Sequence, residues 1–207
     1  MAGIGLSKPV VAVHSSTPGL YTKKVTVGEY IDLTITPNEP SDNSLMGDNQ
    51  EWDTDDGFSG GTVDITTTRL SPAKMVDVLG VKEQATSSTE GAPKHYVFDR
   101  KQKIPHLAVT GIAMVRDDDD PKTYYQAYIV ENVKLRNPTF AFVTKPKGNV
   151  EWQTPKLSGA IYESKREDTN VDHPWLFVSQ LFETEDEAAD YIDDMLQIET
   201  PTPGGGA

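Results

Sequence analysis

The strongest restriction on the fold is a two-residue alternation of apolar and polar side chains. Residues 31–36 read IDLTIT and residues 63–68 read VDITTT. Successive side chains of a strand point to opposite faces, so each segment predicts a strand with one buried and one solvated face. Residues 107–115 are apolar at both parities, which predicts a strand that is covered on both faces.

Further strands are predicted where β-branched and aromatic residues cluster between turn signals. The longest candidate is YYQAYIVENVKL at 124–135. Residues 139–143 and 150–161 suggest a hairpin that turns at 146–149. Residues 174–182 predict one more strand, so the chain is expected to be mainly β.

Two helices are predicted, and both carry end signals. Ser71 at the N-cap, Pro72 at the first helical position and Gly80 just past the end delimit a short helix. Thr184 and Glu187 form a capping box at the start of a C-terminal helix. The apolar face of this second helix holds Ala188, Tyr191, Ile192, Met195 and Leu196, and its outer face is acidic.

A long polar segment interrupts the strands at 37–61. These 25 residues are rich in Asn, Asp, Ser, Gly and Glu, and their large apolar residues are Leu45, Met46, Trp52 and Phe58. Loops of this length in a compact domain are either functional or disordered, so we predict a mobile loop. Residues 87–94 predict a shorter flexible connection. The whole pattern predicts a single domain over 1–200 and a flexible C-terminal tail at 201–207.

Composition excludes several classes of function. The net charge of −13 argues against a protein that grips nucleic-acid phosphates, because that grip depends on Lys and Arg; it does not argue against a protein that lets DNA pass. The absence of cysteine excludes disulfides and thiolate metal sites. The N-terminal segment lacks the basic end and long apolar run of a signal peptide, and no segment resembles a membrane span, so we expect a soluble protein made in the cytoplasm.

Two strings match catalytic motifs without the context that those motifs need. Gly57–Gly61 reads GFSGG, but the G-x-S-x-G nucleophile elbow requires a buried strand before it and a helix after it. An acidic loop precedes this string and a Thr-rich strand follows it, which favours a glycine-rich turn. Ser71–Lys74 matches Ser-x-x-Lys, but the chain has no Lys-Thr-Gly and Ser71 is expected to cap a helix. We therefore predict no catalytic residues and no enzyme activity.

No metal or cofactor site is predicted. The histidines are widely scattered and show no ligand spacing: His14, His95, His106 and His173. The four aspartates at 117–120 could hold a calcium ion, but a solvated turn closed by the following proline is the better interpretation. Calcium binding by the acidic loops is left open as an alternative.

Residues 148–164 read GNVEWQTPKLSGAIYES, and the alternation breaks within them. The apolar residues of 150–153 and 157–161 have opposite parity. Proline cannot donate to a strand ladder and holds the residue before it extended, so Thr154-Pro155 predicts an edge or bulge at which the register shifts by one residue. Gly159 is predicted to allow a close approach of another backbone.

In order and spacing, these features resemble the major tail proteins of long-tailed bacteriophages, the tail-tube subunits of siphoviruses. The similarity extends from about Tyr21 to Leu196 and includes the loop LMGDNQEWDTDDGFSG, the strand and short helix after it, and the extended middle segments. It is most specific at Val-Glu-Phe-x-Thr-Pro-x-Ile-x-Gly, which this chain matches with Trp152 in place of Phe, Thr154, Pro155, Leu157 in place of Ile, and Gly159.

The resemblance implies a β-sandwich or open barrel with a short flanking helix, to which this chain adds the acidic C-terminal helix. Six copies would close into a ring, and rings would stack into a tube through which the genome is ejected. The 37–61 loop, with Leu45, Met46, Trp52 and Phe58, would be the arm that orders when the next ring docks.

The partners implied by this resemblance are other copies of the chain and the tape-measure, tail-terminator and distal tail proteins. Viral DNA would pass through the lumen without specific binding, and no membrane would be involved. The location would be the virion tail, with assembly in the host cytoplasm. The alternative is another virion β-sandwich, such as a head-tail joining protein or an exposed carbohydrate-binding module. A carbohydrate-binding module would show clustered exposed aromatics, whereas the three tryptophans are dispersed in sequence: Trp52, Trp152 and Trp175.

Overall fold

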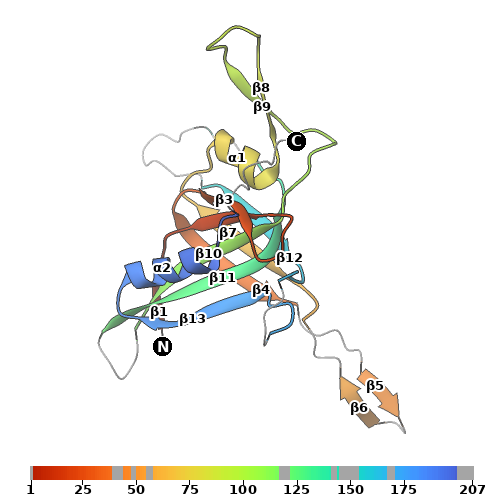
Figure 1. Ribbon diagram of the computed structural model, residues 1–207. Helices are drawn as coiled ribbons and strands as arrows, with labels where there is room; N and C mark the ends of the chain where they lie inside the picture. The colour runs from red at the N-terminus through yellow and green to blue at the C-terminus, as the bar shows by residue number, and fades with distance from the viewer. Residues whose placement is uncertain are drawn as a thin grey trace, which may run out of the picture.

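The chain forms a β-rich body with two helices (Figure 1). The computed structural model describes residues 2–38, 44–47, 50–54, 58–116, 122–140, 144, 154–166 and 171–199. A large antiparallel sheet dominates the body, consistent with a β-sandwich that carries a short helix. The mainly β class predicted from the alternation is therefore confirmed.

The main sheet has nine strands in the order β3-β2-β10-β11-β12-β7-β4, with β1 added to β10 and β13 added to β11. All of these pairs are antiparallel. The strands are β1 (Ala2–Ser7), β2 (Val10–His14), β3 (Tyr21–Thr26), β4 (Tyr30–Pro37), β7 (Gly61–Thr67), β10 (Leu107–Arg116), β11 (Thr123–Leu135), β12 (Lys156–Ile161) and β13 (Leu176–Phe182).

The hairpin of β10 and β11 is the centre of this sheet, and each of its strands changes partner along its length. β10 pairs with β2 over 107–109 and with β1 over 112–116. β11 pairs with β13 over 125–130 and with β12 over 133–135. The sheet therefore splits into two branches on each side of the central hairpin. On the β10 side the branches begin with β2 and β1, and on the β11 side they begin with β12 and β13.

Both faces of the central hairpin are covered, because alternate residues enter different cores. Val109 and Val130 enter a core that β4, β7 and β12 complete. Ala108 and Ile129 enter a second core against helix α2 (Glu185–Met195), which lies along one face of β10 and β11 (Figure 1). Residues 107–112 are all buried, which confirms the prediction of a strand covered on both faces.

The two predicted helices are present, with one correction to a cap. Helix α1 (Pro72–Leu79) ends at Gly80, which has a left-handed backbone with φ of 67°. Ser71 occupies the N-cap position, but its side chain makes no capping hydrogen bond. The prediction of a Ser71 side-chain cap is therefore wrong; the N–H of Lys74, which such a cap could satisfy, donates instead to the Ser71 carbonyl at 3.0 Å.

The capping box of α2 is formed as predicted. The Thr184 hydroxyl accepts from the Glu187 backbone N–H at 3.3 Å, and the Glu187 carboxylate accepts from the Thr184 N–H at 3.1 Å. Ala188, Ile192 and Leu196 are buried in the second core.

One predicted core residue points outward. Ile31 is 54% exposed, although it shares parity with the half-buried residues Leu33 and Ile35. The register of β4 against β7 shifts between Tyr30 and Asp32, so a β-bulge turns Ile31 to solvent and buries Tyr30 in its place. The Ile31 part of the prediction is therefore wrong.

Two segments predicted as loops contain small hairpins. The 37–61 segment holds β5 (Ser44–Gly47) paired with β6 (Gln50–Thr54), and β4 extends into it as far as Pro37. β8 (Lys82–Ala85) pairs with β9 (Lys94–Val97), so 87–94 forms the turn of a hairpin and the start of a strand. Figure 1 shows both hairpins standing away from the main sheet.

The second half of the 148–164 stretch is strand β12, and its faces are as predicted. Leu157, Gly159 and Ile161 are buried. Residues 145–153, which include Trp152, lie outside the described residues, so the register shift at Thr154-Pro155 stays a prediction. Thr139 and Phe140, predicted to begin a strand, have no regular secondary structure.

Replacing Gly159 with alanine should lower the free energy of unfolding by about 2 kcal/mol, because the added methyl group overpacks a closed site. A Cβ at this position would lie 3.0 Å from Leu135 Cδ2, from the Lys134 carbonyl oxygen and from Val133 Cγ1. Urea unfolding would measure the change. Gly3 is the matched control, since a Cβ there has no neighbour within 4 Å; equal losses in the two variants would contradict the close approach.

Candidate functional site

The predicted assembly residues are only partly described. The side chains of Leu45, Met46 and Trp52 lie outside the described part of the chain. Phe58 is half-buried, and its ring stacks on Trp175 with centroids 4.4 Å apart and planes 2° from parallel. Phe58 therefore packs against its own subunit.

Three of the four residues of the predicted structural motif, Thr154, Pro155 and Gly159, lie at the start of β12 or within it, and Trp152 lies outside the described residues. Thr154 and Pro155 are half-buried. The Pro155 carbonyl accepts a hydrogen bond from the Thr67 N–H at 3.1 Å, which extends the pairing of β12 with β7 by one position. Gly159 follows on the same strand, in the close contact described above.

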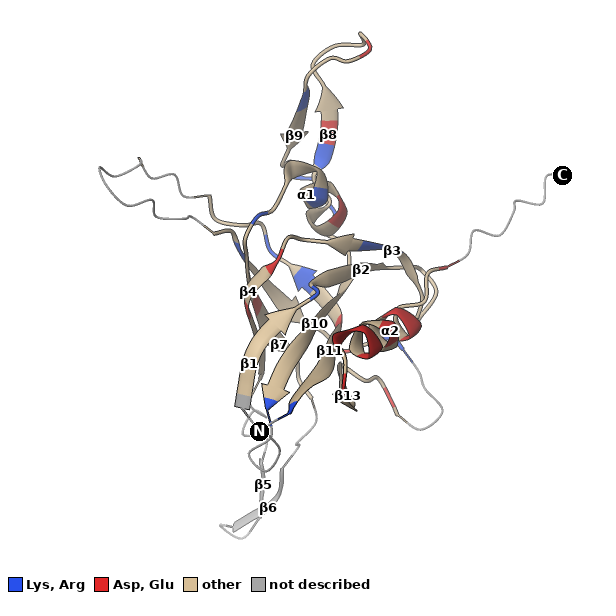
Figure 2. Cartoon of the chain, turned by 90° about the vertical axis from the view of Figure 1, so that its left-hand side faces the viewer, with Lys and Arg blue, Asp and Glu red and all other residues tan. Residues whose placement is uncertain are grey.

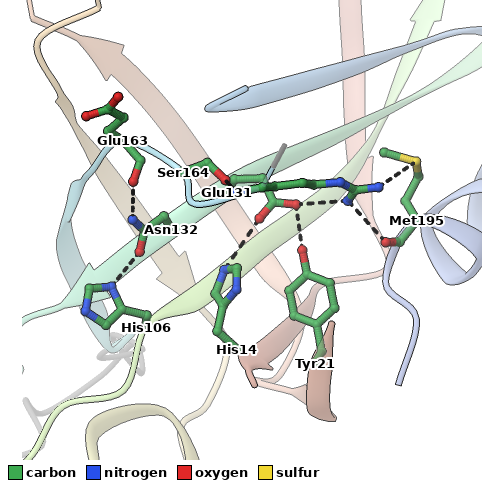
Figure 3. Close-up of polar contacts among 9 residues, drawn as sticks. His14, Tyr21, His106, Glu131, Asn132, Glu163, Ser164 and Met195 are labelled. Carbon is green, nitrogen blue, oxygen red and sulfur yellow. Dashed lines mark hydrogen bonds and ion pairs between the residues drawn. The ribbon is translucent and has the colours of Figure 1, made fainter. Parts of the chain in front are cut away.

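A buried polar cluster, absent from the sequence predictions, lies around Glu131 of β11 (Figure 3). The Glu131 side chain is 0% exposed. The Tyr21 hydroxyl donates to its Oε1 at 2.6 Å, and Arg166 Nη1 donates to the same atom at 3.3 Å. His14 Nε2 lies 3.5 Å from the other oxygen, Oε2. Neither His14 Nε2 nor Glu131 Oε2 has a hydrogen-bond partner within the described residues.

The guanidinium of Arg166 joins this cluster to the end of α2. Its Nη1 also donates to the Met195 carbonyl at 3.4 Å, and the guanidinium carbon lies 5.1 Å from the centroid of the Phe177 ring. The Arg166 backbone N–H donates to the Ser164 hydroxyl at 3.0 Å. One carboxylate thus connects β2, β3 and β11 to the 162–166 segment and, through Arg166, to the C-terminal end of α2.

The cluster lies where the sheet divides. Glu131 and Asn132 of β11 both lie opposite Ala108 of β10, since the register shifts at this point, and Asn132 has a positive φ of 52°. Such a bulge re-aims side chains. The Asn132 amide bridges His106 Nδ1 and the Glu163 carbonyl, which holds the backbone in its unusual conformation.

Burial controls the protonation of this cluster. Burial raises the pKa of Glu131, although the Tyr21 hydrogen bond and the Arg166 charge oppose the rise. Burial also lowers the pKa of His14 to about 4, with smaller contributions from His106 and Arg166. The pKa of Tyr21 is raised, first by burial and then by Glu131. At neutral pH His14 is therefore uncharged, and Arg166 is the cation beside Glu131.

Substituting His14 with glutamine should make the protein less sensitive to acid. The folded pKa of His14, about 4, is below the unfolded value of about 6.5. The stability associated with neutral His14 is therefore present above pH 6.5 and is lost as the pH falls toward 4, by up to about 3 kcal/mol. Urea unfolding across this range, compared with the parent protein, would measure the difference.

The control for this prediction is His95→Gln, because His95 is exposed on β9. The Glu131 contribution has the opposite sign, since a raised pKa favours folding at low pH, and it is common to all three proteins. An equal acid loss in the His14 and His95 variants would contradict the assignment.

A cavity of about 160 Å³ opens beside the cluster. Its lining includes His14, His106, Asn132 and Arg166 together with the 15–19 loop. The Glu131 side chain is fully buried and is not among the residues that line this cavity. The arrangement is that of a polar clamp between elements of the fold.

The catalytic-looking strings occupy ordinary positions. Ser59 is exposed in a coil that leads into β7, and Ser71 precedes α1. Within the described residues, no group of three His, Cys, Asp or Glu side chains is placed to hold a metal ion. The 117–120 aspartates lie outside that part of the chain. None of the helices described is long and apolar enough to cross a membrane.

No protein-family model matches the chain, and comparison with curated proteins likewise gives no match.

Proposed function

We propose that this chain is a structural subunit of the tail tube of a long-tailed bacteriophage. Copies would associate into six-membered rings, and stacked rings would form the conduit for DNA. The proposal rests on the sequence resemblance together with the mainly β architecture. Its partners would be other copies and the tape-measure, terminator and distal tail proteins, and its location the virion.

The observation that carries the proposal is the open edge of the main sheet at β4. β4 is eight residues long and pairs with β7 along one edge, while no described strand pairs along the other. An edge along which no strand pairs presents N–H and C=O groups to other chains; β1 of the same chain lies near part of this edge. Ile31 adds an exposed apolar side chain to this edge strand. A subunit that meets another copy in an assembly accounts for both features.

The composition of the solvent face of β4, β7 and β12 supports the proposal that such a face could line a conduit for DNA. Cross-strand rows on this face join Asp32, Thr66 and Lys156, then Thr34, Asp64 and Ser158, then Thr36, Thr62 and Ala160. Hydroxyl side chains predominate there. The rows continue to Lys134 and Arg136, so the two carboxylates of Asp32 and Asp64 share the face with three cations, one of them Lys156. Because phosphate binding depends on Lys and Arg, a face made mostly of neutral hydroxyls would hold a duplex weakly.

Net charge supports the same role. Six copies of a chain with a charge of −13 would carry −78 per ring, that is 6 × −13. A bore surrounded by this charge would repel phosphates, although salt screens the repulsion beyond about 8 Å. An assembled lumen lined mainly by Lys and Arg would contradict this part of the proposal.

Electron microscopy of the concentrated purified protein tests the proposal. We expect rings and stacked tubes of uniform width, with a bore wide enough for duplex DNA. Mass measurement by light scattering across a dilution series should show large assemblies that dissociate on dilution. A protein that stays monomeric at high concentration, and also in the presence of the other tail proteins, would contradict it.

A further inference from the structure

An acidic groove runs between β13 and α2. Its volume is about 520 Å³. Its lining includes three largely apolar and three acidic side chains: Val178, Phe182, Tyr191, Glu187, Asp190 and Asp194. Val178 is 47% exposed, and no Lys or Arg lines the groove. We refer to this surface as the acidic groove.

The acidic residues of α2 differ in whether they have partners. Asp186 pairs with Lys8 at 2.8 Å, and Asp193 pairs with Lys24 at 2.6 Å. Asp190 and Asp194 are exposed, and within the described residues neither makes an ion pair; the charge of Asp190 contributes to the raised pKa of Lys8, which pairs with Asp186. They lie four positions apart, hence on one stripe of the helix. The carboxylates on this stripe are therefore available to another molecule.

A second surface has the complementary composition. Phe98 and Phe140 are 39% and 52% exposed, and their rings meet edge to face with centroids 5.8 Å apart. Next to Phe98 in sequence, Arg100, Lys101 and Lys103 are exposed, and none has an ion pair in the part of the chain that the structure describes. We call these five residues the basic aromatic face.

The basic aromatic face is held in place by the fold. The Gln102 side chain donates to the Leu79 carbonyl at 2.7 Å and to the Asn137 side chain at 2.8 Å. The segment is thereby fixed against the end of α1, at the same end of the molecule as the β8–β9 hairpin (Figure 1). Figure 2 shows α2, with its acidic residues, on a different side of the body from α1 and this hairpin.

We propose that the acidic groove of one copy binds the basic aromatic face of a second copy. In this contact the apolar side chains of the acidic groove would pack against the rings of Phe98 and Phe140. The carboxylates of the groove would pair with Arg100, Lys101 and Lys103. The contact joins two different surfaces of the same chain, and repeated contacts of this kind generate rings or filaments. The inference rests on the proposed self-assembly and names the surfaces that carry it.

Charge explains why such a contact would be specific. The chain repels other copies through its net charge of −13, so association needs a local match of opposite sign. Complementary charges accelerate encounter and reject wrong orientations. Because salt screens both the net repulsion and the exposed pairs, rising ionic strength should bring the association of charge-reversed variants and of the parent protein closer together.

Charge reversal on the two surfaces tests the inference. In full-length protein, D190K/D194K and R100E/K101E/K103E should each weaken self-association about tenfold, measured by sedimentation velocity, because exposed pairs contribute up to about 1 kcal/mol each. A mixture of the two variants should associate again, since the signs are exchanged between the surfaces. Unchanged association of both variants, or a mixture that stays dissociated, would overturn the inference.

Two matched controls keep the result interpretable. D186K/D193K makes the same two reversals on α2 but at carboxylates that pair within the chain; it should associate like the parent. F98S/F140S should weaken association, whereas Tyr162→Ser, at an aromatic residue 46% exposed elsewhere, should not. Circular dichroism would confirm that each variant is folded.

The outcomes separate this inference from the proposed function. Tubes formed equally well by the parent and by all charge variants would overturn only the contact between the acidic groove and the basic aromatic face. A parent protein that remains monomeric under all conditions would overturn both, because the occupant proposed for the groove is a second copy.

Discussion

Arg166→Ala should lower the free energy of unfolding by about 3 kcal/mol, because it leaves a buried carboxylate without its cation. The Glu131 side chain is 0% exposed and that of Arg166 only 20%. His14 cannot replace the lost charge at neutral pH, since its pKa is about 4. The same substitution removes the guanidinium from the Phe177 ring. Urea unfolding at neutral pH measures the loss.

The control for this result is the adjacent residue. Lys165 is exposed, so Lys165→Ala should change stability by no more than about 0.5 kcal/mol. In the Arg166→Ala background, Glu131→Gln should restore part of the lost stability, because a neutral amide is less costly to bury than an unpaired carboxylate. If Arg166→Ala were as stable as Lys165→Ala, the stabilising role of Arg166 in the buried polar cluster around Glu131 would be contradicted.

Gly80→Ala should cost about 3 kcal/mol or more, for two reasons that add. The left-handed backbone of Gly80, with φ of 67°, penalises a Cβ by roughly 1–2 kcal/mol. The Cβ would also lie 2.1 Å from the Lys103 carbonyl oxygen, so the segment packed on the end of α1 would have to move. Thermal and urea unfolding would both report the loss.

Substitution of Gly91 distinguishes the backbone cost from the steric clash. The Gly91 φ of 78° is also left-handed, but a Cβ there has no neighbour within 4 Å. Gly91→Ala should therefore show the backbone cost alone, about 1 kcal/mol. If Gly80→Ala were no worse than Gly91→Ala, the close packing of the Lys103 segment against α1 would be contradicted.

The run at 107–115, which is apolar at both parities, predicted the two covered faces of β10. Alternation predicted the faces of β7, because a period of two directly encodes which side chains share a face. It failed at Ile31, since a bulge between Tyr30 and Asp32 reverses the faces without leaving a sign in the alternation. The hairpins β5–β6 and β8–β9 were also missed. Their sequences are polar and short, so their pairing depends on local turn geometry more than on an apolar pattern.

The Glu131 clamp could not be predicted from sequence because its parts are remote along the chain. Tyr21 and Glu131 are 110 positions apart, and Glu131 and Arg166 are 35 apart. The one local signal is a Glu-Asn pair inside the apolar run at 124–135. A charged residue in a strand with two covered faces implies a buried partner, but it does not indicate which residue that partner is.

The pairing of β1 with β10 has a consequence for synthesis of the chain. Ala2 lies opposite Arg116, and β2 and β3 join the sheet through the same strand, β10. At about 5–20 residues per second, a ribosome needs roughly 5–20 s to make the intervening segment. During that time the newly made N-terminal strands have no sheet to join, so nascent chains that stall before residue 107 should be the form most dependent on chaperones.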